Sequence, residues 1–144
     1  MAKELTEQTK PKVQTSPTTP LTSTEKGRHA ELLAQTALLA NGWTVLEPIA
    51  AEPFDMAIKR VGDKAISYVQ VKTAFLRNEE RYGGEYIVVR GAKNSGKVYT
   101  MQEVDYFVAV WQGECYMFPN RERSEYWIRP RNLETKWTKL GMDI

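Results

Sequence analysis

Two runs of alternating side chains, residues 54–60 and 65–72, constrain the fold of this chain more than any other feature. The dipeptide Gly62-Asp63 stands between them, and it is typical of a tight turn that joins two antiparallel strands. Successive side chains of a strand point to opposite faces of a sheet. The segment therefore predicts a β-hairpin, and with it a fold that contains a sheet.

This hairpin would bring an acid beside an amide and an amine. Asp55 opens the first run, and Gln70 and Lys72 share one face at the end of the second run. These are the groups that metal-assisted phosphodiester cleavage requires, because Mg²⁺ prefers carboxylate, carbonyl and water oxygens. Candidate ligands are the side chains of Asp55 and Gln70 and the backbone carbonyl of Val71. Lys72 would orient the attacking water or neutralise charge on the phosphate.

A helix before the hairpin supplies a second acid. Residues 22–25 (Thr-Ser-Thr-Glu) form a capping-box pattern, and Asn41-Gly42 is a left-handed stop signal. Glu31 lies at the edge of the apolar stripe of this helix, from which it can point at the sheet while partly buried. We expect Glu31 to be a second metal ligand, directly or through water. Two acids that share a metal with an amine should both be ionised at neutral pH.

The remaining pattern predicts one helix packed on a mixed sheet, which defines an α/β or α+β domain. The expected strands are 43–47, 54–60, 65–72, 85–90, 104–111 and 114–118. We assign residues 22–144 to this domain. Residues 1–21 are rich in Thr, Lys, Gln and Pro, and we predict a disordered arm there.

Composition excludes several classes of protein. The 144 residues, 42% hydrophobic and 26% charged, suit one domain with its own core. No apolar run approaches the roughly 18–20 residues of a membrane span, and none resembles a secretory signal, so we expect a cytoplasmic protein. With one histidine, His29, and one cysteine, Cys115, most zinc sites are excluded. The net charge of +2 permits nucleic-acid binding without arguing for it.

Several short motifs resemble, in their order, the PD-(D/E)xK nuclease superfamily. Residues 26–31 (Lys-Gly-Arg-His-Ala-Glu) are similar to the Lys-Gly-x-x-x-Glu helix opening of Holliday junction resolvases and related small endonucleases. The other segments that resemble this group in order are 42–45, 48–49, 55, 99–100, 104–107 and 116–119. The resemblance implies a restriction-endonuclease-like core in which Asp55, Glu31, Gln70 and Lys72 are the catalytic residues.

Two positions depart from the superfamily pattern. Phe54 precedes the acid where proline is usual, and Gln70 replaces the usual Asp or Glu. Glutamine here resembles a variant found in homing endonucleases of group I introns. An amide oxygen coordinates a metal but brings no charge, so a second metal would bind more weakly. One-metal and two-metal chemistry both stay open.

Basic side chains outside this set are candidates for DNA contacts. Residues 91–98 nearly spell a phosphate-binding loop, but Val98 replaces its Ser or Thr and no helix is expected to follow. A basic loop with Lys93 and Lys97 near DNA phosphates and a plain surface turn are the two alternatives. Arg121 and Arg123 open a basic segment that would bind a phosphate backbone or form a solvated surface.

The expected function is an Mg²⁺-dependent DNA endonuclease in which Mn²⁺ also serves. Because cleavage of both strands needs two active sites, we expect a homodimer or higher oligomer. Homing, junction resolution and restriction stay open as biological roles. The neutral Gln70 keeps a non-catalytic DNA-binding or structural module on the same fold as the alternative. A nucleotide-binding protein that uses residues 91–97 is a third hypothesis.

Overall fold

The computed structural model describes residues 19–142, so the arm predicted over residues 1–21 lies almost entirely outside the described residues. The strands are β1 (Trp43–Leu46), β2 (Met56–Arg60), β3 (Ser67–Thr73), β4 (Phe75–Glu79), β5 (Gly84–Arg90), β6 (Tyr106–Trp111), β7 (Glu114–Pro119), β8 (Glu125–Ile128) and β9 (Thr138–Leu140). The helical elements are α2 (Ser23–Ala40), η1 (Glu80–Tyr82), η2 (Pro130–Asn132) and α3 (Leu133–Lys136). Among residues 19–142, no helix has the length and apolar character that a membrane crossing requires.

Helix α2 begins and ends where the sequence predicts. The Thr22 hydroxyl accepts from the Glu25 N–H at 3.2 Å, and the Glu25 carboxylate accepts from the Thr22 N–H at 2.9 Å, so the capping box is confirmed. Gly42 follows the helix with φ +84°, a conformation that favours glycine. The buried residues Ala30, Ala34, Ala37 and Leu38 form the stripe that faces the sheet.

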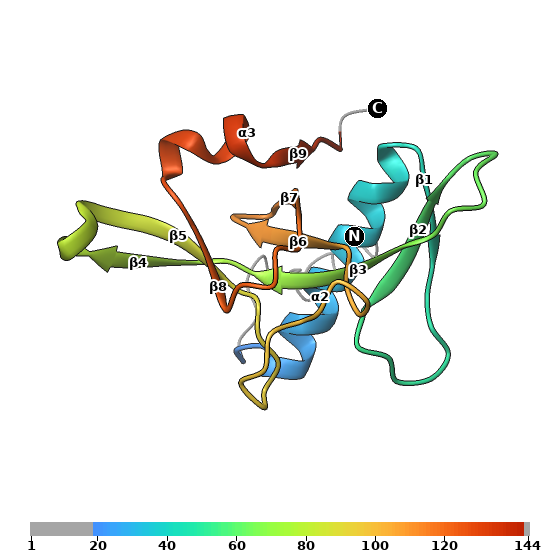
Figure 1. Cartoon of the computed structure of the whole chain (residues 1–144), viewed down its shortest axis with the longest axis horizontal. Coiled ribbons are helices and arrows are strands. Elements are labelled where there is room, and N and C mark those ends of the chain that lie inside the picture. Colours follow the sequence, from blue (N-terminus) through green and yellow to red (C-terminus); the bar gives the residue numbers. More distant parts are fainter. Residues whose placement is uncertain (1–18, 143–144) are drawn as a thin grey trace, which may run out of the picture.

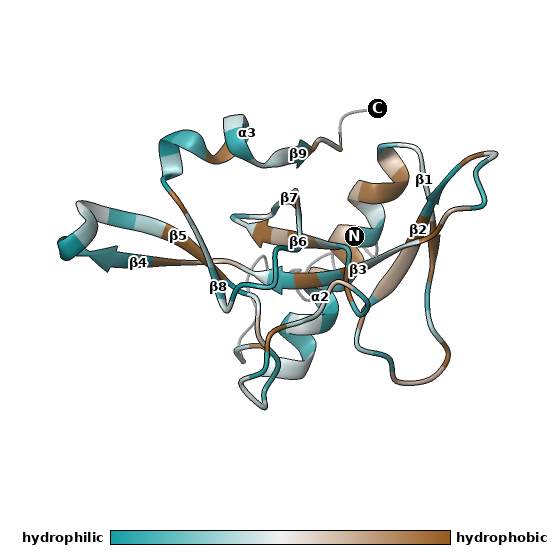
Figure 2. Ribbon diagram, viewed as in Figure 1, coloured by the Kyte–Doolittle hydropathy of each residue, from teal (hydrophilic) through white to brown (hydrophobic). Residues whose placement is uncertain are grey.

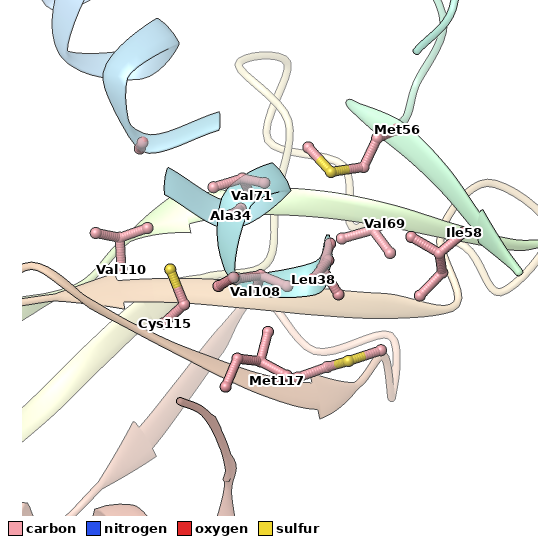
Figure 3. Packing of buried hydrophobic residues seen from close by; sticks show 13 residues of the cluster. Ala34, Leu38, Met56, Ile58, Val69, Val71, Val108, Val110, Cys115 and Met117 are labelled. Carbon is pink, nitrogen blue, oxygen red and sulfur yellow. The ribbon is translucent and has the colours of Figure 1, made fainter. Parts of the chain in front are cut away.

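The main sheet is mixed, with the strand order β1-β2-β3-β6-β7-β9. β3 and β6 are parallel, and the other neighbouring strands are antiparallel. Helix α2 contacts five strands of this sheet. Figure 3 shows Ala34 and Leu38 of the helix packed among Val69 and Val71 of β3 and Val108 of β6. The prediction of a helix packed on a mixed sheet is confirmed.

A second sheet of β4, β5 and β8 extends from the first, because β3 runs into β4 with only Ala74 between them. In Figure 1 the β4–β5 hairpin projects away from α2, and in Figure 2 its far end is hydrophilic. A second apolar cluster lies on the face of β6 opposite α2. Phe107 is its fully buried centre, stacked on Phe118 at 5.6 Å between ring centroids.

Asn120, which follows β7, is a buried polar residue that ties distant segments together. Its Nδ2 donates to the backbone carbonyls of Tyr99 and Val104, both at 2.9 Å, and of Thr100 at 3.3 Å. Its Oδ1 accepts from the Tyr126 hydroxyl at 3.0 Å. Because buried polar groups need such partners, this network fixes the loop before β6 against the end of β7.

The structure differs from the sequence-based strands at several points. β2 begins at Met56 rather than at residue 54, and β3 begins at Ser67 rather than at residue 65. β6 begins at Tyr106 rather than at residue 104, because residues 100–104 form a turn in which the Thr100 N–H donates to Glu103. Tyr99 and Thr100, one of the segments that resemble the superfamily, lie in a loop with the Tyr99 ring buried against Phe107. The strands β4, β8 and β9 were not predicted at all.

Candidate active site

β2 and β3 form the predicted hairpin, and the chain before β2 separates from β3 at Asp55. β2 and β3 are antiparallel with Met56 opposite Val69, and Gly62 takes φ +81° in the turn. Before Met56 the chain leaves β3. There the Asp55 N–H donates to the Val69 carbonyl at 2.9 Å, and the Asp55 carboxylate accepts from the Val71 N–H at 2.8 Å. At this edge of β3 the Asp55 carboxylate therefore accepts the hydrogen bond that the carbonyl of a neighbouring strand would otherwise accept.

A cavity of about 620 Å³ opens at this point. It brings together Asp55, Gln70 and Lys72, the three residues that the sequence placed at one sheet edge. The other residues that line it are Glu52, Pro53, Lys93, Asn94, Ser95, Tyr99 and Glu103. Of these, only Lys93 was a predicted site residue.

Glu31 reaches the same carboxylate from helix α2. Burial raises the pKa of Asp55 to about 6, and the negative charge of the neighbouring Glu31 adds to this rise. The hydrogen bond from the Val71 N–H and the positive charge of Lys72 oppose it. Glu31 and Lys72 therefore both act on the Asp55 carboxylate, although Glu31 is not among the residues that line the cavity.

Lys72 is half-buried on β3, and this burial lowers the pKa of its amine. The charge of Asp55 opposes the decrease, and the charge of Arg90 on β5 adds to it. An amine whose pKa is lowered releases a proton more readily than a solvated lysine. Lys72 is therefore suited to exchange a proton with water in the cavity or to bind an anion there.

The oxygen atoms near Asp55 suit a hard cation that accepts both carboxylate and carbonyl ligands. Within residues 19–142 there is no group of three or more His, Cys, Asp and Glu side chains placed to hold a metal. A metal here would need the Gln70 amide or a backbone carbonyl beside Glu31 and Asp55. The Val71 carbonyl is available for this, because the N–H and carbonyl of a strand residue face the same edge and the N–H of Val71 faces Asp55. Carboxylate and carbonyl oxygens are the ligands of Mg²⁺.

Arg28 holds Glu31, a role that the sequence analysis did not assign. Its guanidinium contacts the Glu31 carboxylate at 3.1 Å and the Glu47 carboxylate at 2.6 Å, and Gln35 donates to Glu47 at 3.1 Å. These contacts link α2 to the end of β1 next to the site. Arg28 and Glu31 stand three residues apart on the helix, which is the spacing at which side chains meet.

The predicted DNA contacts are not all in one place. Lys93 lines the cavity, whereas Lys97 is exposed in the same loop and does not line it. Residues 91–98 form a short hairpin, closed by a 2.8 Å bond from the Lys93 N–H to the Lys97 carbonyl, and no helix follows as a phosphate-binding loop requires. Arg121 and Arg123 are exposed and border a separate hollow of about 170 Å³.

Residues 21–136 match the family of PD-(D/E)XK endonucleases, and the chain belongs to this family. The solved structure of a bacterial homing endonuclease, I-Ssp6803I, is similar to this fold, with a TM-score of 0.54 and 24% sequence identity over 74% of this chain and 75% of that chain. Among curated proteins, none matches. The predictions of the superfamily and of its α+β fold class are confirmed, and the nuclease class is supported by the family. PD-(D/E)XK nucleases generally use divalent metal ions and act on DNA.

Proposed function

We propose that this protein is a divalent-metal-dependent DNA endonuclease whose active site is the cavity at Asp55. The observation that carries this proposal is the meeting of Asp55, Gln70 and Lys72 in one cavity where β2 leaves β3, with Glu31 acting on the same carboxylate. Family membership supports the same chemistry.

The proposed roles follow from the chemistry of each group. Glu31, Asp55, Gln70 and the Val71 carbonyl would hold Mg²⁺ or Mn²⁺. Such an ion supplies Lewis-acid stabilisation of the phosphoryl oxygens and lowers the pKa of bound water. Lys72 orients the attacking water and offsets the negative charge that develops on the phosphate.

We further propose a homodimer or higher oligomer that acts on intracellular DNA, because cutting both strands of a duplex requires two such sites. Homing, junction resolution and restriction all use this reaction. The rival proposal is a non-catalytic DNA-binding module, and the observation that favours it is Gln70, which leaves β3 without a carboxylate in the cavity.

Cleavage of supercoiled plasmid separates the two proposals. The wild-type protein should nick or linearise DNA with Mg²⁺ or Mn²⁺ and leave it intact with EDTA. Lys72→Met removes the amine and keeps the aliphatic chain, so the single-turnover rate should fall about 10²–10³-fold. Lys59→Met, on β2 with its amine 3.4 Å from the Asp63 carbonyl, is the control and should retain the wild-type rate.

Plasmid that stays intact with both metals, while the same protein retards duplex DNA in a gel, would establish the non-catalytic module instead. Equal rates for the Lys72 and Lys59 variants would remove Lys72 from the reaction.

A further inference from the structure

Two amines face one tyrosine ring in the cavity. The Nζ of Lys72 lies 5.3 Å from the centroid of the Tyr99 ring, and the Nζ of Lys93 lies 5.7 Å from it. Burial raises the pKa of Tyr99, and the negative charges of Asp55 and Glu103 raise it further. Both acids therefore lie within electrostatic reach of this ring. The cavity holds a second amine, Lys93, in addition to the lysine of the family motif.

Glu103 fixes the position of Lys93. Its Oε2 is ion-paired with the Lys93 ammonium, and its Oε1 accepts from the N–H of Thr100 at 3.1 Å and from the Thr100 hydroxyl at 3.3 Å. The hydrogen bond from Lys93 is the main reason that the pKa of Glu103 is lowered. An ammonium has three N–H donors, and the contact with Glu103 leaves others for a ligand.

The backbone that carries this pair is held by the fold. Residues 92 and 98 form a β-bridge, and Gly96 completes the turn with φ +89° and an N–H that donates to the Lys93 carbonyl at 2.9 Å. Asn120 binds the carbonyls of Tyr99 and Thr100 on the other side of the pair. An amine fixed in this way can stabilise charge without rearranging during a reaction.

We propose that Lys93, positioned by Glu103, is a second cationic residue that binds the DNA phosphate inside the cavity and stabilises its negative charge during cleavage. This inference rests on the proposed nuclease function and adds a catalytic residue to it. Lys72 would act from the β3 side of the cavity and Lys93 from the loop side. The two lysines offset part of the negative charge of the acids that line the cavity, namely Glu52, Asp55 and Glu103.

Single-turnover cleavage of a short duplex, at saturating protein with Mg²⁺, tests this proposal. Lys93→Gln should lower the rate about 10²-fold, which is the typical effect of losing one fixed donor. Glu103→Gln keeps the acceptor for Thr100 but frees the amine, so a smaller loss of about tenfold is expected on the same basis. Lys93→Arg should recover part of the rate, since it restores the charge with a different shape. Lys59→Gln is the matched control and should cleave at the wild-type rate.

Binding of the same duplex with Ca²⁺ at several salt concentrations gives an independent readout. Lys93→Gln should reduce the slope of log affinity against log salt by about 1, as expected for one lost phosphate contact. If the wild type cleaves and Lys93→Gln cleaves within about threefold of it, well below the loss of a fixed donor, this inference is wrong and the nuclease proposal stands. If the wild type does not cleave, the nuclease proposal fails. The salt slope then decides whether Lys93 binds phosphate: a reduced slope supports the contact, and an unchanged slope overturns it.

Discussion

Replacing Asp55 with asparagine should lower the single-turnover rate of DNA cleavage by about 10³-fold or more, which corresponds to the several kcal/mol that a catalytic metal supplies. The Asp55 carboxylate is held at the edge of β3 by the Val71 N–H, and Gln70, which lines the same cavity, is neutral. No acid on β3 can therefore replace it. Rapid-quench kinetics with Mg²⁺ would measure the loss, and Asp63→Asn, in the exposed turn between β2 and β3, should cleave normally. Cleavage by Asp55→Asn at the wild-type rate would show that the reaction occurs elsewhere.

Asp55→Asn should also stabilise the metal-free protein at neutral pH. A loss of cleavage by this variant could then not be explained by unfolding. Asparagine keeps an oxygen for the Val71 N–H and removes a charge whose burial raises the pKa of Asp55 from 3.8 to about 6. A raised acid pKa means that the ionised form costs stability above about pH 6, and that this cost disappears below about pH 4. At pH 7.5 the gain should be about 1–2 kcal/mol, after allowance for solvent screening of a partly exposed group. Thermal melts from pH 4 to pH 7.5 would follow it, and a lower Tm for the variant at pH 7.5 would contradict this cost of burial.

Asn120→Ala should lower the free energy of unfolding by about 3 kcal/mol, since removal of one buried polar side chain leaves several partners unsatisfied. The side chain joins the carbonyls of Tyr99, Thr100 and Val104 to the Tyr126 hydroxyl. Urea unfolding would measure the change. Asn78→Ala, exposed on β4, is the control, and its effect should be within about 0.5 kcal/mol.

Equal stability of the Asn120 and Asn78 variants would mean that the network contributes little to the fold. We also expect Asn120→Ala to slow cleavage, because it releases the loop that carries Tyr99 next to Lys93.

The parts of the fold that were predictable depend on local pattern. The ends of α2 follow from Thr22, Glu25 and Gly42, and the β2–β3 hairpin follows from alternation on either side of Gly62. The meeting of Asp55, Gln70 and Lys72 in one cavity could be predicted because that hairpin alone brings them together. Glu31 required only the additional assumption that α2 packs on the sheet.

The parts that were missed depend on contacts between segments distant in the sequence. β8 pairs with β5, with Val88 opposite Trp127, and no local sequence pattern predicts this register. Likewise, Glu103 reaches Lys93 because the loop before β6 is folded back and held by Asn120. For this reason the sequence left a DNA-contacting loop and a plain surface turn as alternatives for Lys93, and it indicated neither the acidic partner nor the place in the cavity.

The position of the metal tests the central claim most directly. Crystals of the Lys72→Met variant, which should bind DNA and cut it far more slowly than the wild type, would be grown with duplex DNA and Mn²⁺. The anomalous signal of manganese would locate the ion. We predict one peak in contact with the carboxylates of Asp55 and Glu31 and with the Val71 carbonyl, next to a DNA phosphate. A manganese peak elsewhere on the protein, or DNA bound with its phosphates outside this cavity, would contradict the proposed active site.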